Sequence, residues 1–508
     1  MLTKTSPDEI QSFLSDASYI QGGRADRVVF PETFEEVADV LAAASRSSTP
    51  VTVSGAGTGT VGGRVAFGGV LLATDKLDQI KSLVHTNPNS GSAVAEAGVR
   101  LIDFQRYVEN EGLFYPPDPT ERSCFLGGTV ATNASGARTF KYGPTRKYIQ
   151  RLKIALANGE LVNLRRGEHC ADEGGFLRLP LSSGKSLEAR LPEYRMPRVR
   201  KNASGYYVSP KMDLLDLFIG SEGTLGVILE IEAALFAKPE KLLSGVVFFA
   251  SEEQLLSFVG EARKRSLKTR SDVEKFVSGG RDKYDIDARA LEYFDIESLK
   301  FLRKKYETVP ENAVGAIFFE QETQTATEDH LMTSWLSLLE KHQALVDQSW
   351  FAVNEQDQAK LREFRHALPV LMNEWFASHK QRKVSTDMAV PDEKFPSMLS
   401  FYKETLRSSH LRYTIFGHIG DNHVHVNILP RNDSEAGLAR AIYLQFIRKA
   451  VELGGTISAE HGIGKLKRDY LREQFGEKYL KQMAQLKHVF DPKGILGRGN
   501  IFAEEYLG

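Results

Sequence analysis

The sequence predicts an α+β protein with more than one domain. Its 508 residues are too many for a single hydrophobic core, so we expect two or three cores. Short strand and helix patterns alternate over residues 1–237. Apolar strands separated by amphipathic helices follow over 238–430, and residues 431–508 have a mainly helical pattern. We therefore expect a first domain, an α+β second domain and a helical C-terminal segment with these bounds.

The first domain opens with a helix, a strand and a glycine-rich loop. In "PETFEEVADVLAAASRS" apolar residues recur at helical spacing after Thr33, which can cap the helix, and "PVTVSG" is typical of a short strand. The loop "SGAGTGTVGGR", from Ser54 to Arg64, leads into the strand "GGVLLAT" without a helix between them. A dinucleotide fingerprint or a P-loop opens directly into a helix, so neither template fits.

This loop and two further segments suggest a bound ligand. Its five glycines alternate with hydroxyl side chains, and their N–H groups can form a nest for a pyrophosphate. A tight connection between strands uses the same residues and is the alternative. Segments 116–149 and 217–231 are also rich in glycine, which indicates an extended ligand along the backbone. The Arg-rich stretch from Arg165 to Tyr207 is expected to be an insertion between two strands.

The second domain is predicted from four apolar segments with strand character. They are "LLSGVVFFA" (242–250), "NAVGAIFFE" (312–320), "SWFAVN" (349–354) and "YTIFGHI" (413–419). Amphipathic helical stretches, such as "SEEQLLSFVGEARKRS" and "TEDHLMTSWLSLLEKHQ", separate them. We expect an antiparallel sheet with helices on one face.

Composition excludes several classes of protein. Lysine plus arginine (65) balances aspartate plus glutamate (66), so no strong field favours nucleic acid as a partner. The two cysteines, Cys124 and Cys170, are too few and too far apart for an iron–sulfur cluster. No signal-peptide pattern opens the chain, and no apolar run approaches the ~20 residues of a membrane span. We expect a cytoplasmic protein without a transmembrane segment.

Three histidines in "FGHIGDNHVHVNILP" raise the question of a metal site. His418 and His425 bracket a Gly-Asp-Asn turn between two β-rich runs, so they can face each other across a hairpin. Glu460, in "SAEHGIG", would complete a set of two histidines and one carboxylate, which suits a divalent transition metal. Ordinary hairpin residues are the alternative. Next to Glu460 stands His461, whose ordinary pKa near ~6.5 suits a general base.

The ordered motifs resemble a known flavoprotein family. The glycine loop, "PPDP…GGTVATNASG…YGPTRKYI" and "GSEGTLGVI" resemble the FAD-binding (PCMH-type) domain of the vanillyl-alcohol oxidase / p-cresol methylhydroxylase flavoproteins. "GHIGDNHVHVN" and "SAEHGIGKLKRDYL" are similar to the second half of their D-2-hydroxy-acid dehydrogenase branch, which includes D-lactate and D-2-hydroxyglutarate dehydrogenases and the flavin subunit of glycolate oxidase. The resemblance covers roughly residues 25 to 503. It implies a two-part FAD-binding domain, a substrate (cap) domain, and a C-terminal segment that returns to the FAD domain.

The resemblance also implies site residues. The FAD contacts are expected at Ser54, Gly55, Ala56, Gly57, Thr58, Gly59, Pro117, Asp118, Gly127, Gly128, Thr132, Asn133, Gly136, Tyr142, Glu222, Gly223 and Ile228. The metal, zinc, manganese or iron, is expected on His418, His425 and Glu460, and the catalytic set is His461, Arg365, Lys383 and Asn427. Between Gly55 and Tyr148 the only histidine is His85, so we expect FAD to be bound without a covalent link.

Three positions depart from the family pattern. The usual "GDGN" is here "GDNH", which places Asn422 where glycine is expected and His423 where asparagine is expected. His423 either shares a face with His425, next to a metal ligand, or stays exposed in the turn, and we assign it no catalytic role. Some D-2-hydroxyglutarate enzymes carry a hydroxyl residue where this chain has Pro369, which weakens the case for that substrate.

The expected activity is oxidation of a D-2-hydroxy acid, D-lactate first, to the 2-oxo acid. The resemblance implies that the metal and Arg365 bind the substrate, His461 takes the hydroxyl proton, and a hydride passes to flavin N5. Quinone, cytochrome and electron-transfer flavoprotein stay open as acceptors, and D-2-hydroxyglutarate and glycolate as substrates. A homodimer and peripheral attachment to the inner membrane also stay open. A non-redox transferase like alkyldihydroxyacetonephosphate synthase and a catalytically idle subunit are the competing functions.

Overall fold

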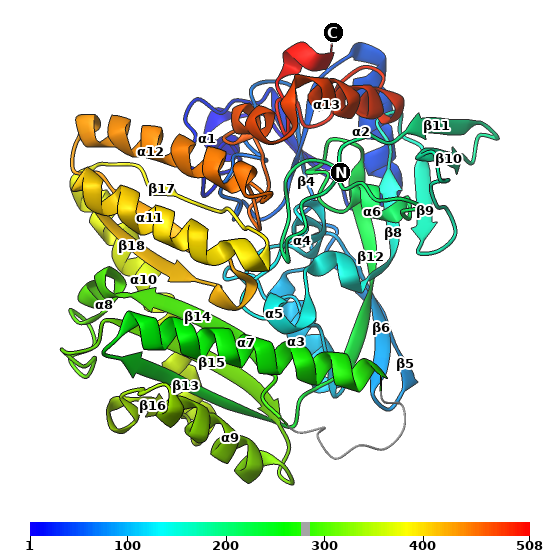
Figure 1. Ribbon diagram of the computed structural model, residues 1–508. Coiled ribbons are helices and arrows are strands. Elements are labelled where there is room, and N and C mark those ends of the chain that lie inside the picture. Colours follow the sequence, from blue (N-terminus) through cyan, green and yellow to red (C-terminus); the bar gives the residue numbers. More distant parts are fainter. Residues whose placement is uncertain (276–284, 508) are drawn as a thin grey trace.

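The first domain is built on two sheets (Figure 1). The computed structural model describes residues 1–275 and 285–507. The first sheet of the first domain has the order β1-β2-β4-β3. Its pairs β2–β4 and β4–β3 are parallel, and β1–β2 is antiparallel. The second sheet is antiparallel, with the order β5-β6-β12-β8-β9 and β7 beside β12. The strands are β1 (Leu2–Lys4), β2 (Arg27–Phe30), β3 (Val51–Ser54), β4 (Val70–Ala73), β5 (Ile80–Asn87), β6 (Ser90–Glu96), β7 (Leu113–Phe114), β8 (Ile149–Ala155), β9 (Leu161–Arg165) and β12 (Val227–Ala237).

The helices of this domain are mostly short. The longest, α2 (Phe34–Ser47), begins where the capping pattern predicts, because the Thr33 hydroxyl accepts a hydrogen bond from Glu36 N at 3.2 Å. The loop after β3 reaches β4 without a helix, as expected. The other helices are α1 (Pro7–Ile10), α3 (Leu101–Asn110), α4 (Leu126–Ala131), α5 (Thr139–Tyr142) and α6 (Leu215–Phe218).

The expected insertion divides into two parts. Residues after β9 form a separate hairpin of β10 (Phe176–Pro180) and β11 (Ser186–Arg190). The chain then continues without regular structure to residue 207 and enters the interior, where the Lys201 side chain is fully buried. Only the hairpin therefore resembles a surface insertion.

The second domain contains an antiparallel sheet of order β16-β13-β15-β14-β18-β19-β17. The four predicted strands are β13 (Lys241–Phe249), β15 (Gly315–Thr323), β16 (Trp350–Phe351) and β18 (Arg412–Gly417). The strands β14 (Ala288–Asp295), β17 (Val384–Ser385) and β19 (His425–Leu429) complete it. Central β14 was not among the predicted strands.

Helices cover both faces of this sheet, so the expectation of one covered face is wrong. Val247 and Phe249 share a core with residues of α7 (Glu252–Lys275) and α9 (Glu328–Lys341). Val246 and Phe248 pack with α8 (Ile296–Leu302) and α10 (Glu355–His379) on the other face. Consecutive apolar residues in "GVVFF" bury both faces of β13, which is the pattern of a doubly covered strand. Figure 1 shows α7 lying along these strands.

The helical C-terminal segment returns to the first domain. The helix α11 (Phe395–Ser409) lies between β17 and β18, whereas α12 (Asp433–Glu452) and α13 (Arg468–Phe490) follow the last strand of the sheet, and α13 has a kink at Gly476. Beyond α13, Val51 N in β3 donates to Ile495 O at 2.8 Å, and Gly497 N donates to Val51 O at 2.9 Å. Within residues 1–275 and 285–507, the chain has no helix with the length and apolar character of a membrane span.

A buried ion pair fastens this return. Lys487 donates to Asp491 Oδ2 at 2.6 Å and to the carbonyls of Thr224 and Leu496 at 2.8 and 2.9 Å. The Asp491 carboxylate also accepts from the backbone N–H groups of Ile495 and Leu496 at 3.0 and 2.8 Å. Both side chains are almost completely buried.

Asp491→Ala should destabilise the protein strongly, because the Lys487 ammonium would stay buried without its counter-charge. Loss of one partner of a buried pair lowers the free energy of unfolding by about 3–5 kcal/mol, which urea denaturation measures. Asp469→Ala is the control, since that side chain is 83% exposed. Equal stability of the two variants would contradict the role of the pair.

Candidate active site

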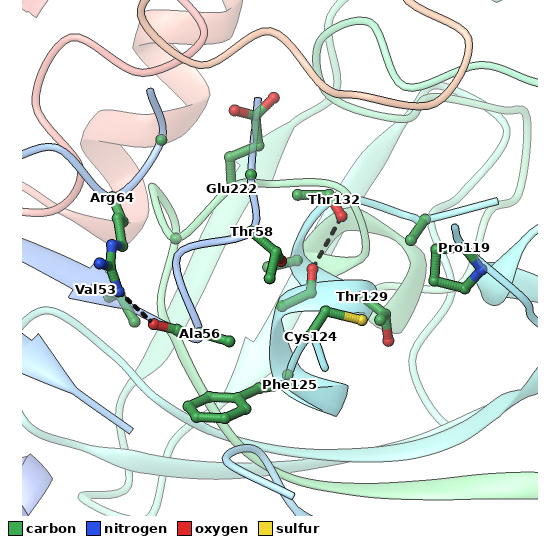
Figure 2. A pocket seen from close by; sticks show the side chains of 18 of the residues that line it. Val53, Ala56, Thr58, Arg64, Pro119, Cys124, Phe125, Thr129, Thr132 and Glu222 are labelled. Carbon is green, nitrogen blue, oxygen red and sulfur yellow. Dashed lines mark hydrogen bonds between the residues drawn. The ribbon is translucent and has the colours of Figure 1, made fainter. Parts of the chain in front are cut away.

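A cavity of about 320 Å³ lies where the three glycine-rich segments meet. Its walls come from the loop after β3, from the segment leading into α4, and from the turn before β12. Glu460 and His461, from the C-terminal segment, also line it. Figure 2 shows Ala56, Thr58, Thr132 and Glu222 around this space.

Most of the residues predicted to contact FAD line this cavity. Gly127 shows why bulk is excluded, since a Cβ added there would lie 2.6 Å from the Cβ of Ala97. Gly57 has φ of +77°, and an added Cβ would lie 2.4 Å from the Arg64 guanidinium carbon. The predicted residues that line the cavity are Gly55, Ala56, Gly57, Thr58, Gly59, Gly127, Gly128, Thr132, Glu222, Gly223 and Ile228.

Six predicted FAD contacts are not among the residues that line it: Ser54, Pro117, Asp118, Asn133, Gly136 and Tyr142. Several of them have roles within the chain. A Cβ added at Gly136 would lie 1.9 Å from Asp118 O, so the close approach of these two segments requires glycine there. Asn133 accepts a hydrogen bond from Arg146 N at 3.0 Å, and the Tyr142 hydroxyl donates to Glu322. Asp118 faces a neighbouring cavity, where it pairs with Arg138 at 3.2 Å.

Arg64 was not predicted as a site residue, yet it braces the glycine loop. Its guanidinium donates to Gly55 O at 3.0 Å (Figure 2) and to Ser54 Oγ at 3.3 Å, and Nε donates to Ser15 O at 2.9 Å. The loop is therefore held open by a side chain from its own C-terminal end. Other unpredicted lining residues include Pro119, Thr120, Glu121, Cys124, Phe125 and Thr129.

Glu222 joins the cavity wall to the "SAEHGIG" loop. Its carboxylate accepts hydrogen bonds from Ile463 N and Gly464 N, both at 2.7 Å. Burial raises the pKa of Glu222 to about 7, although these two N–H groups act in the opposite direction. The turn before β12 thus holds the loop that carries Glu460 and His461.

The expected metal ligands converge. His418 Nε2 lies 3.3 Å from Glu460 Oε2, and His425 Nε2 lies 3.8 Å from the same oxygen. The other ring nitrogens are already bound: His418 Nδ1 donates to Glu292 at 2.7 Å, and His425 Nδ1 donates to Thr386 O at 2.9 Å. Such bonds leave both Nε2 atoms facing Glu460 Oε2, and in known metal sites a second acceptor orients each imidazole in the same way.

The surrounding charges favour a cation at this point. Burial alone would lower the pKa of His418, but Glu292 and Glu460 raise it to about 9. Lys201 lies 2.6 Å from Glu460 and 3.1 Å from Asp421, and its side chain is fully buried. Neither Lys201 nor Glu292 was predicted as a site residue. An acidic residue in the middle of the mainly apolar strand "ARALEYFD" was the available signal for Glu292.

The residues present fit a divalent ion. One donor atom from each of His418, His423, His425 and Glu460 lies within 4.8 Å of the others. Among the described residues, the ring nitrogens of His423 and the side-chain amide of Asn427 are buried without a hydrogen-bond partner, although Asp387 Oδ1 lies 3.3 Å from His423 Nε2. Buried polar atoms rarely stay unpaired, so an ion with its own ligands would satisfy the cluster. Imidazole and carboxylate together suit a transition metal.

His461 lies between this cluster and the cavity. Its ring stacks on His425, with centroids 5.5 Å apart, and its Nδ1 is 3.5 Å from Asp387 Oδ2. A third of the His461 side chain is accessible to solvent. Burial of the rest lowers the pKa of His461 to about 4, although Asp387 acts in the opposite direction. The imidazole is therefore uncharged at neutral pH and can accept a proton.

Asp387 holds the "SAEHGIG" loop in place through hydrogen bonds. It is fully buried and accepts from Ser458 Oγ at 2.7 Å and from Lys467 Nζ at 2.6 Å. It also accepts from the backbone N–H groups of Glu460 and His461 at 3.2 and 3.0 Å. Its position in "STDMAVP", an acidic residue entering an apolar run, was the only sequence signal.

The other predicted catalytic residues differ in how far their side chains are buried. Arg365, in α10, donates to Glu292 at 3.2 Å, so it adjoins His418 through that carboxylate. Asn427, in β19, is fully buried. Lys383 is exposed, although nearby protein lowers its pKa to about 8. Because water reaches the Lys383 ammonium, we expect it to stay protonated at neutral pH.

A second cavity, of about 500 Å³, adjoins Arg365. Pro119 and Thr120 line both cavities. The arginines that face the second one are Arg122, Arg138, Arg289, Arg362 and Arg365. Arg289 is paired with Glu320 at 2.6 Å, whereas Arg362 lies 3.8 Å from that carboxylate.

Comparison with known proteins gives the family. Residues 238–501 match the model of the C-terminal domain of FAD-linked oxidases, and residues 25–165 match an FAD-binding domain. The chain belongs to the FAD-linked oxidases. Its two matched regions meet at the cavity, which confirms the predicted PCMH-type FAD-binding fold and identifies this FAD-linked oxidase as a flavoprotein oxidoreductase.

Several curated proteins resemble this FAD-linked oxidase over nearly their whole length. A D-lactate dehydrogenase of Anaerostipes hadrus is 31% identical, over 97% of this chain and 93% of that protein. Glycolate oxidase subunit GlcD of Bacillus subtilis is 29% identical, over 94% of this chain and 89% of its own. A D-2-hydroxyglutarate dehydrogenase of Stutzerimonas stutzeri is 25% identical, over 98% and 96%.

Among solved structures, an alkyldihydroxyacetonephosphate synthase has the same fold. Its TM-score is 0.64 with 16% identity, and the alignment covers 97% of this chain and 82% of the synthase. Identity at this level supports the shared architecture alone.

We predict that acid denaturation releases free FAD from the purified FAD-linked oxidase. His85 lies in β5, exposed and away from the cavity, and no other histidine stands between Gly55 and Tyr148. Flavin fluorescence in the supernatant after precipitation measures the release. Flavin that sediments with the protein would contradict non-covalent binding.

Proposed function

We propose that this FAD-linked oxidase oxidises a D-2-hydroxy acid, D-lactate first, to the 2-oxo acid. One observation carries the proposal: Glu460 and His461 line the cavity and also belong to the histidine clusters beside it. A substrate held at the clusters would therefore adjoin the flavin. The D-lactate, D-2-hydroxyglutarate and glycolate enzymes among the relatives support the same substrate class.

The chain's own groups suit the two halves of such a substrate. Arginine binds a carboxylate through two parallel hydrogen bonds, and Arg365 lies next to the cluster through Glu292. His461 would take the hydroxyl proton, because its imidazole is uncharged at neutral pH and reaches the cavity. Lys383 and Asn427 would orient the substrate beside these two groups.

Both bound groups supply chemistry that these side chains lack. Bound FAD would supply the acceptor for the hydride that leaves C2 of the substrate. A divalent ion on His418, His425 and Glu460 supplies a positive charge that lowers the pKa of the hydroxyl. Lys201 balances part of the Glu460 charge, and Glu292 and Thr386 hold the imidazoles in place.

The second cavity favours a second candidate substrate. Five arginines face it, Arg365 included, and Arg362 lies farther from the Glu320 carboxylate than Arg289 does. A 2-hydroxy acid with another acidic group, such as D-2-hydroxyglutarate, could direct that group there. Pro369, in place of a hydroxyl residue, is the feature that weakens this substrate.

The transferase and the idle subunit are less well supported. The synthase shares the fold at 16% identity, whereas the dehydrogenases reach 31% identity over nearly the full length. Intact convergence of His418, His425 and Glu460 also favours an active oxidoreductase.

Anaerobic reduction of the flavin tests the function. D-lactate, L-lactate, D-2-hydroxyglutarate and glycolate are mixed separately with the purified protein, and loss of flavin absorbance is followed by stopped flow. We expect D-lactate to bleach the flavin faster than L-lactate. Bleaching by D-2-hydroxyglutarate alone would select the second candidate, and no bleaching by any member would contradict the proposed function.

His461→Asn and Glu460→Ala should separate proton transfer from metal binding. His461→Asn should keep metal and FAD but slow flavin reduction by roughly 10²–10⁴-fold, as loss of a general base does. Glu460→Ala should lose the metal itself, because it removes the carboxylate on which both histidines converge.

Metal content by mass spectrometry and stopped-flow reduction measure both effects. Removal of the metal by a chelator should reproduce the Glu460→Ala result while FAD stays bound. A metal-free Glu460→Ala protein with full activity would refute the metal-assisted reaction.

A further inference from the structure

His423 is enclosed within the histidine cluster. The turn places it there: Asn422 has φ of 54°, and His423 N donates to His418 O at 3.2 Å. The side chain is fully buried. Of the two positions open from sequence, the exposed one is therefore excluded.

The ring of His423 is close to both histidines expected to bind the metal. Its centroid is 4.5 Å from that of His425 and 5.5 Å from that of His418. One donor atom of His423 lies within 4.8 Å of donor atoms of His418, His425 and Glu460. Small side-chain rotations would bring four donors to one ion at bonds of about 2.1 Å.

Neither ring nitrogen of His423 has a hydrogen-bond partner among the residues that the structure describes. The closest charged group is Asp387, whose Oδ1 is 3.3 Å from His423 Nε2. A buried polar group without a partner costs about 1–3 kcal/mol. The imidazole therefore needs either a firm bond to Asp387 or another partner.

Asp387 does not need His423. Its carboxylate already accepts from Ser458 Oγ and Lys467 Nζ and from the N–H groups of Glu460 and His461. Three of these donors reach Oδ2 and only Glu460 N reaches Oδ1, so Oδ1 keeps a lone pair for His423 Nε2. Asp387 can therefore orient the His423 ring through Nε2, but His423 Nδ1 would still have no hydrogen-bond partner among the described residues.

We propose that His423 is a third imidazole ligand of the metal, which makes the donor set three histidines and Glu460. This proposal rests on the metal of the proposed function. Three nitrogens and one carboxylate bind zinc or iron more tightly than manganese, which prefers oxygen ligands. The ion must then accept a fifth ligand for a substrate to reach it, as zinc does in some catalytic sites.

Metal affinity without turnover tests the assignment. The metal-stripped, FAD-loaded protein and its His423→Asn variant are titrated with Zn²⁺ and with Mn²⁺ against a chelator of known affinity. His423→Asn should weaken Zn²⁺ binding by at least the ~10–100-fold that loss of an outer-sphere partner costs. The preference for Zn²⁺ over Mn²⁺ should fall with it. His342→Asn is the matched control, because His342 is buried but pairs with Glu261 in the second domain.

X-ray absorption at the zinc edge counts imidazole ligands in the unaltered protein, so the proposal stays testable if His423→Asn does not fold. We expect three imidazoles. Two imidazoles, or Zn²⁺ affinity unchanged in His423→Asn, would overturn the role of His423 and leave the metal of the proposed function intact. Absence of Zn²⁺ binding by the unaltered protein would overturn both.

Discussion

This structure depends on one constraint: its buried carboxylates need counter-charges. Glu292, Glu460 and Asp387 lie inside the protein, where an unpaired charge is strongly destabilising. A line of contacts between acidic and basic side chains meets that need, in the order Arg365, Glu292, His418, Glu460, Lys201 and Asp421. Its members come from α10, β14, the hairpin of β18 and β19, the "SAEHGIG" loop and the segment after β11. The electrostatics that hold these distant elements together also define where a cation is favoured.

Local patterns in the sequence predicted much of the fold. The Thr33 cap, the helix-free glycine loop and four strands of the second domain all follow from apolar spacing and turn residues. The two-sided cover of the sheet was missed, although the unbroken apolar run of β13 contained the signal. Central β14 was missed because Glu292 interrupts its apolar pattern. A charged residue in a strand is normally a sign of exposure, and here its partner lies 126 positions further along the chain.

The candidate site was predictable where its residues share a motif. His418 and His425 stand on one hairpin, and Glu460 and His461 are adjacent. Their spacing in the sequence is therefore enough to identify them as candidate site residues. Lys201 and Asp387 could not be found in this way, because each acts through contacts between segments far apart in sequence. The sequence also did not show which glycines make room for a ligand and which make room for neighbouring backbone. Gly127 makes room along the cavity wall, whereas Gly136 makes room for the neighbouring backbone at Asp118, and both look alike in sequence.

The return of the C-terminal segment has a consequence for the order of synthesis. β3 hydrogen-bonds to residues 495 and 497, and Glu222 hydrogen-bonds to residues 463 and 464. A ribosome delivers these partners only after most of both described domains has emerged. One side of β3 therefore lacks its neighbour until residues 495 and 497 are made. A chain that stopped before residue 460 would lack Glu460 and His461 on the wall of its own cofactor site.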